Sequence, residues 1–93
     1  MTTTKLFGNL RSHVEEHVLD VSGETVGEVL ENLCDGRDGL RKALFSGDSL
    51  QAYVRVMVNG RDVELDQGMA TPVGDGDQIA IFPPIAGGAG VYL

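Results

Sequence analysis

The sequence contains one cysteine, no tryptophan and few aromatic residues, and each shortage excludes a class of structure. Because Cys34 stands alone, the chain has no internal disulfide, no Cys-x-x-Cys redox pair and no cysteine-ligated iron–sulfur cluster. Three phenylalanines and two tyrosines among 93 residues leave a core made mostly of valine, leucine and isoleucine. At roughly 100–200 residues per domain, this length predicts a single small domain.

Long apolar segments are also missing. No run approaches the ~20 residues that a membrane-spanning helix needs, and the first residues lack the apolar segment of a signal peptide. We therefore expect a soluble, cytoplasmic protein that has no membrane partner.

Positive charge is scarce. Seven lysines and arginines face fourteen aspartates and glutamates, which gives a formal net charge of −7. Such an acidic chain repels phosphate backbones, so nucleic acid is not an expected partner, whereas a basic protein surface is. Lys5 and Lys42 are the only lysines, and this acidic, lysine-poor composition favours a halophile as the source.

Two strands are expected near the N-terminus. Residues 3–10 have strand character with a bend or bulge at Gly8. Apolar residues alternate with polar ones over 14–21, which is the pattern of a half-buried strand. A short turn at 11–13 is expected to join the two strands as a hairpin.

The clearest local signal is the start of a helix. Thr25 is followed three residues later by Glu28, which predicts a capping box for a helix over 25–34. Apolar residues follow at helical spacing and form one stripe, namely Val26, Val29, Leu30, Leu33 and Cys34. A second, shorter helical segment is expected over 38–45.

Strand character returns over 53–58. Valines occupy alternate positions and are expected to face the core, whereas Tyr53, Arg55 and Met57 face the other side. Asn59-Gly60 follows directly, and this pair is the strongest short-range signal for a hairpin turn because both residues tolerate positive φ.

The remaining elements complete one sheet. A return strand is expected over 61–65 with Val63 and Leu65 facing inward, then a loop over 69–77 and a last strand over 78–82. The order is two strands, a main helix, a short helix and three strands. This order predicts an α+β fold in which the main helix covers one face of a sheet.

The segment 81–88 reads Ile-Phe-Pro-Pro-Ile-Ala-Gly-Gly and resembles the C-terminus of ubiquitin-like sulfur carriers. This family includes the small subunit of molybdopterin synthase, the thiamine-pathway sulfur carrier and the small archaeal modifier proteins. The resemblance covers nearly the whole chain and rests also on Lys5-Leu6-Phe7, residues 24–30, Val58-Asn59-Gly60 and Asp75-Gly76-Asp77. It implies a β-grasp fold over 1–84, with a mixed sheet of four to five strands, and a flexible tail over 85–93.

The resemblance implies that the reactive group is the backbone carboxylate of Gly88. An E1-like enzyme would adenylate this carboxylate with ATP, so the carrier would need no bound cofactor and no catalytic residues of its own. The adenylate would then become a thiocarboxylate for molybdopterin or tRNA thiolation, or would be conjugated to target lysines. Gly87, Ala86, Pro84 and Pro83 would thread into the activating enzyme, because glycine lacks a Cβ and proline stiffens the exit.

The chain departs from the family pattern after Gly88, because residues 89–93 follow it. At ~3.3 Å per extended residue, these five residues would carry the carboxylate of Leu93 roughly 17 Å past the expected position. One hypothesis is that a protease, expected to be a metalloprotease, removes them and exposes Gly88. The alternative is a β-grasp protein-interaction module that is never conjugated.

A partner surface is expected on the open side of the sheet, where the resemblance implies contact with the activating enzyme and with a sulfur-acceptor enzyme such as a molybdopterin synthase large subunit. Its residues are Phe82, Ala80, Met57, Tyr53 and Arg55. Lys5 and Lys42 are candidate acceptors of another modifier.

Two other groups of residues have simpler readings. Cys34 ends the apolar stripe and is expected to be a buried core residue rather than a sulfur-handling thiol. His13 and His17 are four residues apart, but in a turn and strand this spacing does not converge, so no metal site is expected.

Overall fold

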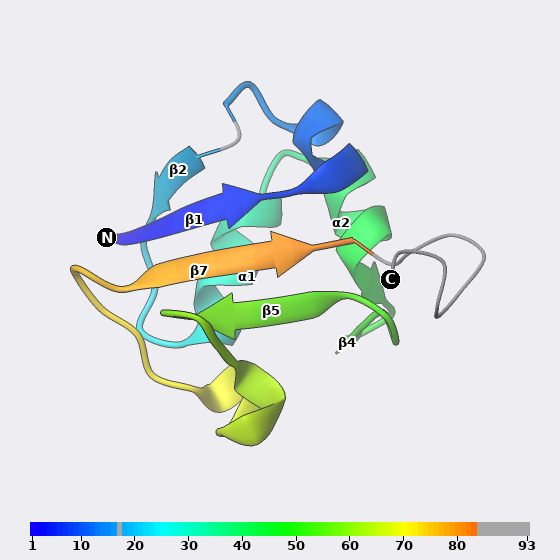
Figure 1. The fold of residues 1–93 in the computed structure, drawn as a ribbon. Helices are drawn as coiled ribbons and strands as arrows, with labels where there is room; N and C mark the ends of the chain where they lie inside the picture. The colour runs from blue at the N-terminus through cyan, green and yellow to red at the C-terminus, as the bar shows by residue number, and fades with distance from the viewer. Residues whose placement is uncertain (17, 84–93) are drawn as a thin grey trace.

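The computed structural model describes residues 1–16 and 18–83, and in this range a mixed five-stranded sheet carries two helices on one face (Figure 1). The strand order is β2-β1-β7-β5-β6. These strands are β1 (Thr2–Leu6), β2 (Val18–Val21), β5 (Arg55–Val58), β6 (Arg61–Asp62) and β7 (Gln78–Phe82). The helices are α1 (Val26–Cys34) and α2 (Asp38–Leu44), and β3 (Phe45–Ser46) pairs with β4 (Ser49–Leu50) in a separate hairpin. The expected α+β fold with the main helix on one face is confirmed.

The centre of the sheet joins the first and last strands. β1 and β7 pair in parallel, with Leu6 opposite Ile81, whereas the other neighbouring strands are antiparallel. Alternate residues point toward α1, so Leu6, Val56 and Ile81 are buried together with the apolar stripe of the helix. Within residues 1–16 and 18–83, no helix lies on the opposite face of the sheet, which is called the open face below (Figure 1).

The expected cap of α1 is present. The backbone N–H of Glu28 donates to Oγ1 of Thr25 at 3.2 Å, which satisfies one of the free donors of the first turn. The Glu28 carboxylate accepts in return from the backbone N–H of Glu24 at 2.9 Å, one residue before the N-cap. At the other end, Arg37 Nη1 donates to the carbonyl of Leu33 at 2.9 Å.

The N-terminal strands are shorter than expected. β1 ends at Leu6, and the 3-10 helix η1 (Gly8–His13) replaces both the end of the strand and the turn. Gly8 has a φ of +60°, which takes the backbone out of the β region, and Leu10 then turns into the core. β2 begins only at Val18, and His17 lies outside the described residues.

The prediction for the return strand is wrong after Asp62. The 3-10 helix η2 (Val63–Leu65) begins there, because Oδ1 of Asp62 accepts from the backbone N–H of Glu64 at 2.9 Å. With three residues per turn, Val63 still faces the core but Leu65 does not, and Leu65 is 68% exposed. A third 3-10 helix, η3 (Gly68–Ala70), overlaps the start of the loop predicted over 69–77. None of the helices in the described part of the chain has the length and apolar character to cross a membrane.

Candidate functional site

The central strand β7 leads directly to the predicted reactive tail. It ends at Phe82, and Pro83 is the last residue that the structure describes. Of the residues expected to thread into the activating enzyme, only Pro83 is described. Pro84, Ala86 and Gly87 lie outside the described residues, as does the predicted reactive residue Gly88, so these roles stay predictions. The boundary expected between domain and tail at residues 84 and 85 lies there as well.

An aromatic pair marks the end of the sheet from which the tail leaves. The rings of Phe7 and Phe82 are stacked, with centroids 4.5 Å apart and planes 13° from parallel. Phe7 reaches this position because its N–H donates to the carbonyl of Ile81 at 3.1 Å, one residue beyond the end of β1. The sequence analysis did not identify Phe7 as a site residue. The signal that could have found it is the parallel pairing of the first and last strands.

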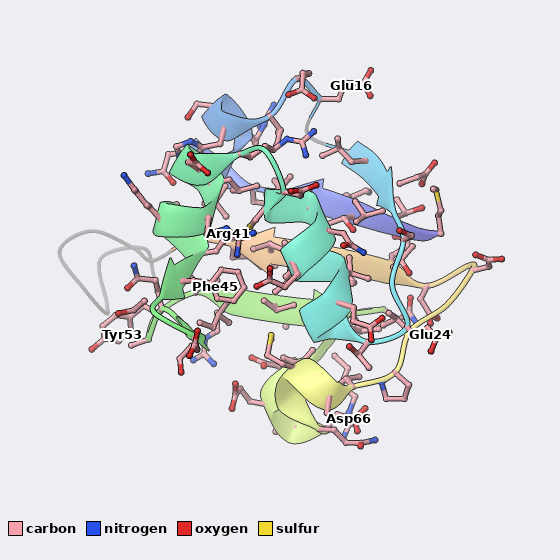
Figure 2. All side chains as sticks on the ribbon, turned by 180° about the vertical axis from the view of Figure 1, so that it is seen from behind. Glu16, Glu24, Arg41, Phe45, Tyr53 and Asp66 are labelled. Atoms are coloured by element: carbon pink, nitrogen blue, oxygen red, sulfur yellow. The ribbon has the colours of Figure 1, made fainter. Side chains whose placement is uncertain are left out.

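The structure brings four of the five predicted surface residues together on the open face. Arg55 pairs with Phe82 and Met57 pairs with Ala80 across β5 and β7, and their inward neighbours are buried. Tyr53 is different, because β5 begins only at Arg55. It projects from the loop before β5 and is 74% exposed (Figure 2). The predicted patch therefore has a core of four residues.

Two cations lie on the same open face. Lys5 is opposite Ala80 in the pairing of β1 and β7 and is exposed. Arg55 donates from Nη1 to Oδ2 of Asp62 at 3.2 Å, so its guanidinium is held toward β6. Lys42, the other candidate acceptor, is exposed on α2 and is therefore separate from this patch. The open face thus combines apolar side chains with these two cations and with the carboxylates of Asp20 and Asp62.

Cys34 is a core residue, as expected. Its side chain is fully buried at the end of α1, and burial raises the pKa of its thiol to about 11. Arg41 and Arg37 oppose this effect and Glu31 adds to it, but desolvation dominates. The thiol is therefore protonated and inaccessible at neutral pH, which does not suit a nucleophile that handles sulfur.

The histidine prediction can be examined at His13 alone. Its ring lies against Gly39 of α2, where an added Cβ would be 3.0 Å from Nδ1. Over residues 1–16 and 18–83, no three His, Cys, Asp or Glu side chains form a group that could hold a metal ion.

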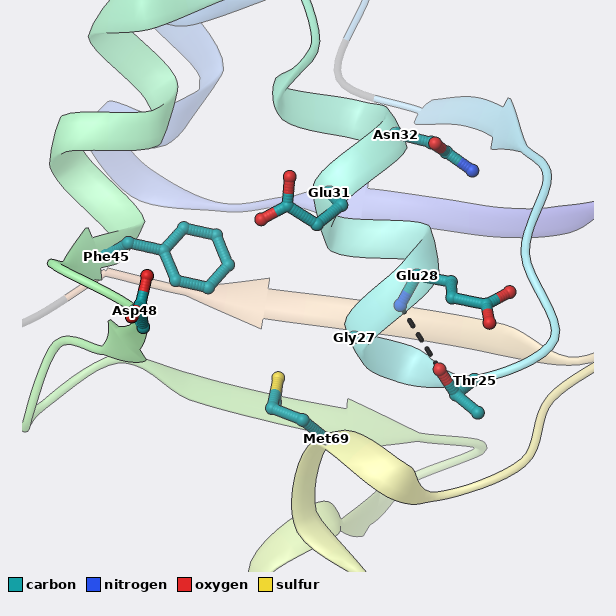
Figure 3. A pocket seen from close by; sticks show the side chains of 8 residues that line it. All are labelled: Thr25, Gly27, Glu28, Glu31, Asn32, Phe45, Asp48 and Met69. Carbon is teal, nitrogen blue, oxygen red and sulfur yellow. Dashed lines mark hydrogen bonds between the residues drawn. The ribbon is translucent and has the colours of Figure 1, made fainter.

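A hollow of about 530 Å³ lies on the helix side of the molecule, between α1, η3 and the β3–β4 hairpin. Figure 3 shows Phe45, Asp48 and Met69 facing α1 across this space. Its carboxylates include Glu31, which binds Nη1 of Arg41 through both oxygens at 3.1 Å and raises the pKa of Arg41. The sequence analysis missed this hollow because it did not predict the hairpin.

Comparison with known protein families gives a match over most of the chain. The model of the ThiS family matches residues 4–88. Small archaeal modifier protein 3 of Haloferax volcanii is 45% identical over 64 residues, which cover 69% of this chain and 70% of that protein. The sulfur carrier protein CysO of Mycobacterium tuberculosis is 35% identical over 83 residues, which cover 85% and 89% of the two chains.

Solved structures show the same fold. The small archaeal modifier protein 1 of Methanosarcina acetivorans superposes with a TM-score of 0.86 at 34% identity, covering 94% of this chain and 95% of that one. A chain of the BexX/CysO complex of Amycolatopsis orientalis gives a TM-score of 0.83 at 30% identity, covering 95% and 100%. The expected ubiquitin-like β-grasp fold is confirmed. The chain belongs to the ThiS family, and its class is that of the ubiquitin-like sulfur carriers and protein modifiers.

Proposed function

We propose that Gly88 becomes the C-terminus of the working protein and that its carboxylate is the group that reacts. The main support is that the family match ends at Gly88, although the chain continues for five more residues. A protease, which we take to be a metalloprotease, would add water across the peptide bond between Gly88 and Ala89. This step leaves the Gly88 carboxylate on the domain and releases residues 89–93 as a peptide.

The freed carboxylate would then be activated with ATP by an E1-like enzyme. A carboxylate oxygen of Gly88 attacks the α-phosphorus, a bond between two phosphates breaks, and pyrophosphate leaves. The product is an acyl adenylate. The nucleotide is held by the enzyme, so the carrier binds no cofactor. The proposed reaction belongs in the cytoplasm, where ATP is available.

The adenylate has two proposed fates that differ in the nucleophile. Hydrosulfide from a sulfur donor displaces AMP and leaves a thiocarboxylate, which a sulfur-acceptor enzyme such as a molybdopterin synthase large subunit, or a tRNA-thiolating enzyme, can use. Alternatively, a lysine amine of a target protein displaces AMP, loses a proton and forms an isopeptide bond. Lys5 and Lys42 are exposed and are proposed acceptors on the chain itself.

In this proposal the folded body docks and delivers the tail but performs no catalysis. The open face supports this role, because it presents Met57, Ala80 and Phe82 beside the end of β7. An apolar patch of this kind is suited to a partner that must hold the body while the tail enters its active site. One of the similar solved chains is part of a complex with a partner protein, BexX.

Intact mass spectrometry of the protein from its own cells tests the proposal. We expect a species that ends at Gly88, with sulfur in place of one terminal oxygen, or Gly-Gly remnants on lysines of other proteins. Gly88→Ala should abolish both products. Gly90→Ala is the matched control, because it changes a glycine that the proposed cleavage removes. A protein found only in its uncut form, with Leu93 attached, would leave the alternative of a non-conjugated interaction module.

A further inference from the structure

The two residues that follow β1 lie against the two residues where β7 ends. Phe7 stacks on Phe82, as described above, and Gly8 contacts the ring of Pro83. A Cβ added to Gly8 would lie 2.8 Å from Cγ and 3.3 Å from Cδ of Pro83. Gly8 also has a φ of +60°, a conformation that other residues rarely adopt. The Pro83 ring therefore occupies the space that any side chain at position 8 would need.

We propose that Phe7-Gly8 and Phe82-Pro83 form an exit clamp that sets the direction in which the chain leaves the sheet. In this clamp Gly8 is a positioning residue for the activation of Gly88. The inference rests on the proposed function. It adds Phe7-Gly8, a segment far from the tail in sequence, to the residues that set the direction of the tail.

The parts of the clamp constrain the exit in complementary ways. The stacked rings hold the end of β7 against the end of β1. The hydrogen bond from the Phe7 N–H to the Ile81 carbonyl fixes the register between these two strand ends. Pro83 has a locked φ and no N–H, so the β ladder cannot continue through it. Because the Pro83 ring lies against Gly8, the chain at Pro83 cannot bend toward β1.

The length of the tail makes this direction important. Residues 84–88 span roughly 16 Å when extended, at ~3.3 Å per residue. For a tail held extended in the active site of the enzyme, a tilt of about 10° at Pro83 would move the far end by ~3 Å, and a misplacement of about 1 Å can already lower a rate by 100-fold. A body that docks correctly but aims the tail wrongly would bind the enzyme without being turned over.

Gly36 offers a matched control for substitution at Gly8. It also has a positive φ, at +75°, but nothing lies within 4 Å of the Cβ that alanine would add. Gly36→Ala therefore introduces the same kind of backbone strain without touching the exit. The difference between Gly8→Ala and Gly36→Ala isolates the contact with Pro83.

The test uses chains that end at Gly88, since all contacts described above lie within residues 1–83. The variants are Gly8→Ala, Gly36→Ala, Pro83→Ala and the double variant that combines Gly8→Ala with Pro83→Ala. Adenylation by the E1-type enzyme of the same organism is followed by ATP–pyrophosphate exchange. Each variant is also used as a competitive inhibitor of the wild-type chain, which reports docking of the body separately from turnover.

We expect Gly8→Ala to lower kcat about five-fold or more relative to Gly36→Ala, with an inhibition constant within about two-fold of the wild type. In the Pro83→Ala background, Gly8→Ala should lower kcat no more than Gly36→Ala does, because the proline ring that the new methyl group would displace is absent. Equal kcat values for Gly8→Ala and Gly36→Ala would overturn the clamp. A Gly8→Ala defect of the same size in both backgrounds would overturn it as well.

NMR of the full chain separates failure of the clamp from failure of the proposed function. Contacts between the Gly8 α-protons and the Pro83 ring should be present in the wild type and in Gly36→Ala. Their absence in the wild type overturns the clamp whatever the enzyme does. If they are present but the wild-type chain is not adenylated, the exit geometry stands and the proposed function is wrong.

Discussion

The buried thiol of Cys34 gives a test of whether sulfur chemistry belongs to a side chain or to the chain end. We compare the wild type with Cys34→Ala in urea unfolding between pH 7.5 and 10.5. Burial raises the pKa of Cys34 from its ordinary value of 9.0 to about 11. Below about pH 8 the thiol is almost fully protonated in both the folded and the unfolded chain, so it adds little pH dependence there.

The sign of the effect follows from which state keeps its proton. As the pH rises from 9 to 11, the unfolded chain loses the thiol proton first, so the folded state becomes relatively less stable. The difference between 9.0 and about 11 corresponds to a limiting loss of about 2.7 kcal/mol above both values, of which about 1.9 kcal/mol is expected by pH 10.5. Cys34→Ala should be less stable at pH 7.5 by about 1 kcal/mol, but this cysteine-dependent slope should be missing from it.

Alkylation with iodoacetamide provides the second readout. At pH 8 a thiol with a pKa of about 11 is ionised about 100-fold less than one at 9.0, and burial slows the reaction further. Parallel stability curves for the two proteins, or rapid alkylation of the native chain, would refute the reasoning. Either result would make Cys34 an accessible thiol and reopen it as a carrier of sulfur in place of Gly88.

Three further predictions follow from particular contacts. Val63→Ala should lower the free energy of unfolding by about 2 kcal/mol and Leu65→Ala by less than about 0.5, because Val63 is buried and Leu65 is exposed. Thermal unfolding measures both losses, and losses of similar size would mean that both residues face the core. Thr25→Ala should cost about 1 kcal/mol and Thr25→Ser much less, because serine keeps the oxygen that accepts from Glu28; equal losses would exclude the cap. Met57→Glu should leave the melting temperature nearly unchanged but raise the KM for adenylation, because it places a charge within the apolar patch on the open face. An unchanged KM would exclude this face as the docking surface.

Local signals predicted the parts of the fold whose contacts are local. The capping residues and the apolar stripe of α1 lie within ten positions of one another, so helix 25–34 could be placed from the sequence alone. The return strand failed at Leu65 because two or three residues do not distinguish a period of two from the three-residue turn of η2. The β3–β4 hairpin has only two residues in each strand, which is too short for any periodicity.

The candidate site divides in the same way. Alternation along β5 and β7 was enough to place Arg55, Met57 and Ala80 on one face. The position of Phe7 depends on the parallel pairing of β1 with β7 and on a backbone hydrogen bond between residues far apart in sequence. No pattern within either strand encodes that contact. Tyr53 was assigned to a strand because the alternation extends to it, although the ladder begins two residues later.

The place of β7 in the middle of the sheet has a consequence for how the protein is made. This strand comes from residues 78–82, yet it is the strand that joins the β2–β1 pair to the β5–β6 pair in the sheet. A chain interrupted before these residues would lack the strand that holds the two halves of the domain together, and it would also lack the residues proposed to react. Completion of the sheet and formation of the proposed reactive end therefore both depend on one continuous segment, residues 78–88.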